Sequence, residues 1–187
     1  SLRLGKSLGV NNIPYKICTY SCIYCQVGKA IKMQINRQEF YRPDDLIDEA
    51  KALLNHIQNE KDYPDYITIV PDGEPTLDIN LGILIEKLKT LGVPVAVITN
   101  ASLIDLPKVQ NDLLKANYVS FKADAFSPET WKKINIPHKR LDLQSIKKGI
   151  RVFRNYFSGK MVTETMLVKG VNDSPDAVSY THLTLPT

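Results

Sequence analysis

All three cysteines of this 187-residue chain lie within eight positions, at Cys18, Cys22 and Cys25. Thiolates are soft ligands that suit zinc or an iron–sulfur cluster. A structural zinc site needs four ligands in a closed shell, and the histidine nearest in sequence is the distant His56. Three thiolates can instead hold three irons of a [4Fe–4S] cluster and leave the fourth iron open to a small molecule. The spacing therefore favours a cluster, with a zinc site or inert buried thiols as the alternatives.

A second candidate element is the stretch PDGEPT at residues 71–76. Gly73 allows a backbone to approach a ligand closely, and the carboxylate of Glu74 suits a cationic amine. Asp-Gly and proline are also ordinary turn residues between a strand and a helix. The stretch alone leaves both interpretations open.

The elements that must position these residues alternate between strand and helix. Apolar runs rich in β-branched residues predict strands at 7–13, 65–70, 93–100, 118–123 and 160–170. Helical spacing of apolar residues predicts helices at 43–57, 77–91, 107–116 and 142–157. Such an order predicts one domain with a parallel sheet covered by helices.

Chemistry in parallel α/β folds sits at the carboxyl ends of the strands. The cysteines follow the first predicted strand, residues 71–76 follow the second, and Asn100 ends the third. Polar side chains alternate along the fourth strand and are expected to face one way: Ser120, Lys122 and Asp124. On the fifth strand Glu164, Met166 and Val168 share a face, where they either meet a ligand or fill the barrel.

The motif Cys18-x3-Cys22-x-Tyr24-Cys25 resembles the cluster motif of radical S-adenosylmethionine (radical SAM) enzymes, with an aromatic residue before the last cysteine. The stretches RLGKSLGVNNIPYKICTYSCIYCQVGK and VPDGEPTLD resemble the subgroup of wyosine-forming tRNA enzymes and their bacterial relatives. The resemblance implies an α/β fold, a partial TIM-like (β/α)6 radical SAM barrel that stops after about its fifth strand.

The resemblance also implies the chemistry. A [4Fe–4S] cluster on the three cysteines would bind S-adenosylmethionine and cleave it reductively to a 5′-deoxyadenosyl radical, which abstracts hydrogen from a substrate. The subgroup implies a tRNA base as that substrate and a flavodoxin- or ferredoxin-like electron donor. The alternatives are a protein or small-molecule substrate, or a non-catalytic iron–sulfur or zinc binding module that would not need Gly73 and Glu74.

Individual roles follow from the same resemblance. Gly73, Glu74 and Pro75 match the glycine–glutamate motif that contacts the methionine amino group, with Asp72 in place of the usual first glycine. Tyr24 is expected to pack over the adenine. Further contacts to the sugar and carboxylate of S-adenosylmethionine are expected from Asn100, Ser120, Lys122 and Asp124.

Charge is concentrated between residues 132 and 160. This stretch carries one acid, Asp142, against nine basic residues: Lys132, Lys133, Lys139, Arg140, Lys147, Lys148, Arg151, Arg154 and Lys160. A basic helix face can contact RNA phosphates, although a solvated outer helix has the same composition.

Composition sets the remaining bounds. Hydrophobic residues make up 43% and charged residues 24%, and the apolar runs are too short to span a bilayer. Crowded, odd-numbered cysteines argue against a disulfide framework and for a reducing cytoplasm. We expect residues 1–177 to be a fragment of a radical SAM core domain, because the chain starts at Ser1 and its last residues, 178–187, resemble an adaptor-derived cloning scar.

Overall fold

The computed structural model describes residues 4–125 and 127–175. Its main feature is a parallel sheet with the strand order β1-β4-β5-β6-β7. The strands are β1 (Ser7–Val10), β4 (Tyr66–Ile69), β5 (Val95–Thr99), β6 (Tyr118–Lys122) and β7 (Lys160–Glu164). Since all neighbouring pairs are parallel, the five carboxyl ends meet at one edge, as the sequence predicts.

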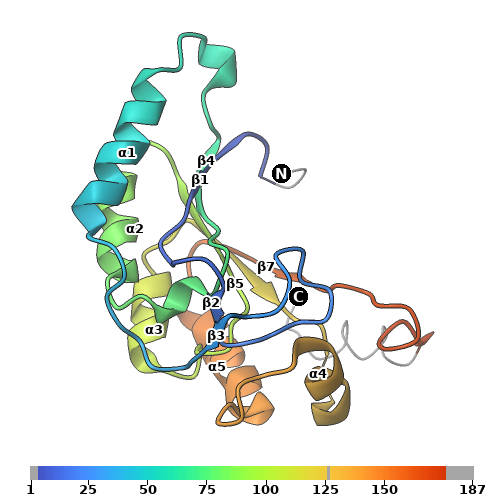
Figure 1. The fold of residues 1–187 in the computed structure, drawn as a ribbon. Coiled ribbons are helices and arrows are strands. Elements are labelled where there is room, and N and C mark those ends of the chain that lie inside the picture. Colours follow the sequence, from blue (N-terminus) through green and yellow to red (C-terminus); the bar gives the residue numbers. More distant parts are fainter. Residues whose placement is uncertain (1–3, 126, 176–187) are drawn as a thin grey trace.

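Helices connect successive strands. They are α1 (Pro43–Asn55), α2 (Leu81–Lys89), α3 (Pro107–Leu113), α4 (Pro128–Asn135) and α5 (Leu143–Tyr156), with short 3-10 turns η1 (Glu60–Asp62) and η2 (Pro75–Leu77). Helices α1, α2 and α3 stand in a row along one side of the sheet, whereas α4 lies apart from them, on the far side of α5 (Figure 1). The partial barrel predicted from the sequence is confirmed.

A small second sheet brackets the cysteines. Strands β2 (Ile17–Cys18) and β3 (Lys32–Met33) pair in parallel, and the segment between them holds Cys22 and Cys25. The sequence did not predict this ribbon, because two-residue strands leave no periodic pattern. It ties both ends of the cysteine loop together.

The predicted fifth strand, 160–170, is too long. The strand ends at Glu164, so Met166 and Val168 do not continue its alternation. Beyond Glu164 the backbone bonds to side chains, with the Met166 amide donating to Asp124 and the Val168 amide donating to Asn172. These hydrogen bonds replace the backbone pairing that a longer β7 would continue with β6.

Two helix predictions also need correction. The helix expected at 77–91 begins only at Leu81, because residues 75–77 form η2, which the Glu74 side chain caps by accepting from the Thr76 amide. Helix α4 was not predicted, although Ser127 caps it and Pro128 opens it. The adaptor-like segment 178–187 lies outside the described residues. Within the described residues, no helix has both the length and the apolar character needed to cross a membrane.

Arg37 joins three separate parts of the chain through hydrogen bonds and an ion pair. Its Nε donates to the Thr76 carbonyl at 2.8 Å and its Nη2 to the Asp78 carbonyl at 2.7 Å. The same Nη2 lies 2.5 Å from the carboxylate of Asp112 on α3, and the two side chains are only 11% and 17% exposed. A guanidinium supplies several donors in a fixed plane, so this one residue holds the segment after β3 against η2 and α3.

Replacing Arg37 by methionine is expected to lower the free energy of unfolding by about 2–4 kcal/mol, because it leaves Asp112 and two carbonyls without their donor. Thermal denaturation of the two proteins measures the difference. Lys87→Met is the matched control, since Lys87 forms an exposed ion pair with Asp44 and its loss should leave the melting temperature nearly unchanged. Equal shifts for both variants would contradict the role given to Arg37.

Candidate functional site

The three cysteines line one cavity beside the carboxyl end of β4. The cavity has a volume of about 120 Å³, and Lys16, Asp72 and Gly73 are among the other residues that line it. All three cysteines are free thiols; Cys18 and Cys22 are half-buried and Cys25 is exposed. The structure thus brings together the two motifs, 18–25 and 71–76, that the sequence singled out.

The carboxyl end of α4 holds the cysteine loop by its backbone. The Ser21 amide donates to the Asn135 carbonyl at 3.0 Å, and the Ile23 amide donates to the Ile134 carbonyl at 2.9 Å. The last carbonyls of a helix have no partner within the helix, so the loop satisfies groups that would otherwise be left unbonded. Loop and helix end therefore fix each other.

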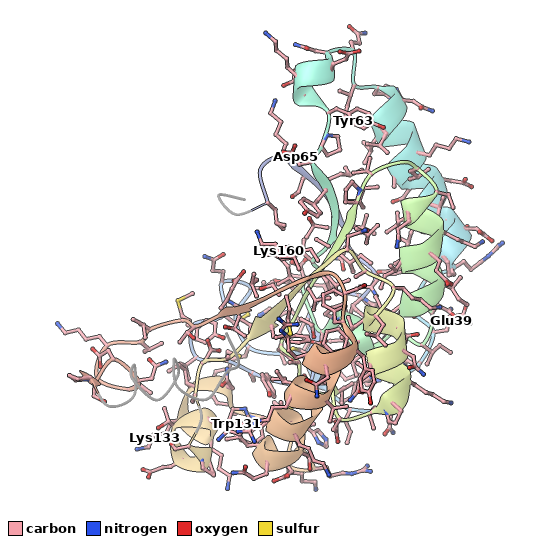
Figure 2. All side chains as sticks on the ribbon, turned by 180° about the vertical axis from the view of Figure 1, so that it is seen from behind. Glu39, Tyr63, Asp65, Trp131, Lys133 and Lys160 are labelled. Atoms are coloured by element: carbon pink, nitrogen blue, oxygen red, sulfur yellow. The ribbon has the colours of Figure 1, made fainter. Side chains whose placement is uncertain are left out.

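An aromatic contact reinforces this attachment. The indole of Trp131 donates to the hydroxyl of Tyr20 at 3.2 Å, and the two rings pack edge to face with centroids 5.9 Å apart. Both side chains are buried. Trp131 lies on the side of α4 that faces α5, whereas Lys133 lies on its outer side (Figure 2).

The turn after β4 grips the other side of the cysteine segment. The Lys16 amide donates to the Asp72 carbonyl, and the Glu74 amide donates to the Ile17 carbonyl, both at 3.1 Å. A Cβ on Gly73 would lie 2.0 Å from the Ile17 carbonyl oxygen, which no side chain can tolerate. Glycine is needed here so that the turn can pack directly against the residue before Cys18.

Glu74 is buried, with 1% of its surface exposed, and its carboxylate bonds within the protein. One oxygen accepts from the Thr76 amide and from the hydroxyls of Thr76 and Thr99, and the other accepts from the Asn100 amide at 2.8 Å. Burial raises the pKa of this carboxyl group, and the four donors oppose that shift. The side chain joins the ends of β4 and β5, while the backbone beside it faces the cavity.

Asn100 connects the end of β5 to the cysteines. Its amide nitrogen donates to the Thr19 hydroxyl at 2.7 Å and points at the sulfur of Cys18 at 3.6 Å. The predicted site residue is therefore in place next to a thiol.

Asp124 and Tyr24 also meet, as part of one hydrogen-bonded group. The Tyr24 hydroxyl donates to the Asp124 carboxylate, which also accepts from the side chain of Asn135 at 2.8 Å and from the Met166 amide at 2.8 Å. Asp124 is buried. Its carboxylate thus fixes the cysteine loop, α4 and the segment after β7 relative to one another.

Ser120 and Lys122 face the same way, as their alternation predicts. Both contact Glu164 across the β6–β7 pair, Ser120 at 2.9 Å and Lys122 at 3.4 Å. Lys122, Asn100 and Asp124 line a smaller cavity of about 20 Å³. Pro75, the remaining predicted residue, is buried at the start of η2 and its carbonyl accepts from Asn12.

Two residues beside the cysteine segment escaped the sequence analysis. Lys16 is 8% exposed, and its ammonium group donates to the Lys29 carbonyl at 2.8 Å within the cysteine segment. Asn135 donates to the sulfur of Cys22 at 3.4 Å. The nearness of Lys16 to the motif was a usable signal, whereas nothing in the sequence marks Asn135.

Burial disfavours the charged form of two of the three thiols. Burial and, next, the Glu74 carboxylate raise the pKa of the Cys18 thiol to about 12. Burial also raises the pKa of Cys22, against hydrogen bonds from Asn135 and Tyr24. Metal ligation requires thiolates, so binding at this site must release protons.

The donor set fits a polynuclear cluster. A structural zinc site needs four donors around one point, whereas the cysteine segment supplies three thiols. An iron–sulfur cube needs one thiolate for each of three irons at separate positions around a cavity. Three soft thiols spread around a shared cavity meet that requirement.

The sequence matches a protein-family model and curated relatives. Residues 12–179 match the family model described as the Radical SAM superfamily. A UPF0026 protein of Methanocaldococcus jannaschii is 45% identical over 181 residues, which is 97% of this chain and 56% of that protein. The chain therefore spans about half the length of this curated relative.

Solved structures show the same fold at low identity. The structure of TYW1 with a lysine–pyruvate adduct bound has a TM-score of 0.66 and 21% identity, covering 91% of this chain and 59% of that one. The structure of histidine-tagged anSMEcpe with bound AdoMet has a TM-score of 0.70 and 16% identity, covering 95% and 48%.

Gly73→Ala is expected to displace the cysteine segment, because the new methyl group would overlap the Ile17 carbonyl. We expect a several-fold fall in the iron bound after anaerobic reconstitution, measured by iron and sulfide analysis. Gly9→Ala is the control, since the nearest atom to a Cβ there is 3.9 Å away. Normal iron content in Gly73→Ala would show that the close approach does not matter for this site.

Proposed function

This chain belongs to the Radical SAM superfamily, and we propose that it cleaves S-adenosylmethionine reductively at a [4Fe–4S] cluster held by Cys18, Cys22 and Cys25. The observation that carries the proposal is the single cavity in which the three thiols meet the backbone of Gly73. A soft-ligand set and a close-approach glycine at one point suit a cluster with a small molecule bound beside it.

The cluster, when bound, supplies the electron that breaks the carbon–sulfur bond of S-adenosylmethionine and yields the 5′-deoxyadenosyl radical. The chain's own residues bind the cluster and S-adenosylmethionine and orient them relative to each other. Asp72 and Gly73 line the cavity, and Gly73 can offer it only backbone, which suits recognition of the methionine amino group. Lys16 places a buried cation in the same wall, where it offsets the negative charge of thiolates or of a carboxylate.

Glu74 has a positioning role in this proposal. Its carboxylate is saturated by Thr76, Thr99 and Asn100, so it holds the strand ends rather than reaching the cofactor. Tyr24, Asn100 and Asp124 border the cysteines and are assigned to the cofactor site. Ser120 and Lys122, with Glu164, form a separate polar group on β6 and β7 that suits the sugar or the substrate.

We assign the substrate to RNA, in keeping with the resemblance to wyosine-forming enzymes. Lys148, Arg151 and Arg154 are exposed along α5, and Lys139 and Arg140 are exposed just before it. Burial and, next, the positive charge of Arg151 lower the pKa of Lys147. Such a face suits phosphates. A cytoplasmic location and a flavodoxin- or ferredoxin-like donor complete the proposal; a protein or small-molecule substrate is the alternative.

The central reaction is tested with the purified protein, reconstituted anaerobically with iron and sulfide and reduced with dithionite. We expect 5′-deoxyadenosine to form from S-adenosylmethionine, detected by mass spectrometry, and to vanish in Cys22→Ala because one iron loses its thiolate. A bound cluster without cleavage would favour the binding module. Bound zinc in place of iron would rule the proposal out.

The RNA assignment is tested by charge reversal. Lys148→Glu with Arg151→Glu is expected to weaken tRNA binding about tenfold or more and to reduce its salt dependence, because phosphate contacts are lost. The double variant Lys51→Glu with Lys108→Glu changes the net charge equally at exposed positions on α1 and α3. Filter binding across a range of salt concentrations measures the tRNA affinity and its salt dependence for both double variants. Equal losses in the two variants, or none in either, would argue for a substrate other than RNA.

A further inference from the structure

Two asparagine side chains aim their amide groups at cysteine sulfurs. The Nδ2 atom of Asn135 lies 3.4 Å from the sulfur of Cys22, and that of Asn100 lies 3.6 Å from the sulfur of Cys18. Each amide has two N–H groups, and in each case the second one donates to an oxygen, of Asp124 or of Thr19 respectively. Both amides therefore share their two N–H groups between one sulfur and one oxygen, although the two residues come from different elements.

The surrounding bonds fix which end of each amide faces the sulfur. The Oδ1 atom of Asn100 accepts from the Ser102 amide at 2.9 Å, and a backbone N–H requires an acceptor there. Asp124 offers Asn135 a carboxylate oxygen, which requires a donor. Neither side chain can turn over without losing a bond, so an N–H group points at each sulfur.

Asn135 holds the cysteine loop in two ways. Its carbonyl accepts from the Ser21 amide, and its side chain donates to Cys22 one residue further along. Only 2% of its surface is exposed. A buried donor so close to a candidate ligand acts without competition from water.

A hydrogen bond to a ligating sulfur stabilises negative charge on it. Reduction of an iron–sulfur cluster adds one electron, and part of the added charge spreads onto the thiolates, so such bonds raise the reduction potential. We propose that Asn135, with Asn100 as its counterpart, is a positioning residue that orients the thiolate of Cys22 and eases reduction of the cluster. This inference rests on the proposed function, because it needs a cluster on the cysteines.

The test is an EPR-monitored redox titration of the anaerobically reconstituted protein. Asn135→Leu removes both donors at similar volume, and we expect its equilibrium constant for reduction to fall by up to about tenfold, or about 59 mV for one electron. Asn135→Asp keeps the shape but places a second carboxyl group against Asp124, where the two share one proton; no N–H group then faces the sulfur, so the potential should again fall.

Asn172→Leu is the matched control. Asn172 is also buried, at 3% exposed, and its amide donates to the backbone carbonyls of Asp124 and Met166 but to no sulfur. The reduction potential of the cluster in Asn172→Leu should equal that in the unmodified protein. A potential unchanged in Asn135→Leu, or shifted equally in Asn172→Leu, would overturn the inference while leaving the proposed function intact.

Two further outcomes also decide the matter. If both Asn135 variants fail to bind the cluster while Asn172→Leu binds it, the residue is needed for assembly and the effect on potential is rejected. If the unmodified protein itself binds no iron–sulfur cluster, the proposed function fails and this inference fails with it.

Discussion

The buried carboxylate of Glu74 is the constraint on which the rest of the site depends. It accepts from Thr76, Thr99 and Asn100, and so it joins the carboxyl ends of two neighbouring strands across the sheet edge. A carboxylate shielded from water is tolerated only when its oxygens are bonded, and these donors meet that need. Because its bonds are internal, the adjoining backbone at Gly73 is left to face the cavity.

The cysteine loop has almost no regular structure of its own and is held from outside. The turn at 72–74 grips it on one side, and the end of α4 accepts its amides on the other. Both sets of hydrogen bonds use backbone groups, so the three thiols and the Lys16 side chain are left to line the cavity. A binding site assembled in advance loses less conformational entropy when its ligand arrives.

Much of the fold could be predicted from local pattern. The strands at 65–70, 93–100 and 118–123 are runs of β-branched and apolar residues, and proline or aspartate marks the start of α1 and α5. The strand predicted at 160–170 was too long, because bonds from Asp124 and Asn172 capture its backbone after Glu164. The bond to Asp124 spans 42 residues of sequence, and local sequence carries no information about such a partner.

The same limit applies to the site. Spacing singled out Cys18, Cys22 and Cys25 as candidate ligands, and the PDGEPT stretch offered Gly73 as a candidate for close approach to a ligand. The roles of Arg37 and Asn135 depend on contacts across 75 and 113 residues of sequence, and no periodic pattern reports contacts of that range.

The most direct measurement is Mössbauer spectroscopy of the ⁵⁷Fe-reconstituted protein, recorded with and without S-adenosylmethionine. In the proposed cluster, the three thiols of the cavity would each bind one iron and leave the fourth iron to S-adenosylmethionine. We predict the spectrum of a [4Fe–4S] cluster in which S-adenosylmethionine changes the parameters of a single iron. A spectrum that S-adenosylmethionine leaves unchanged, or iron that is not in such a cluster, would contradict the account.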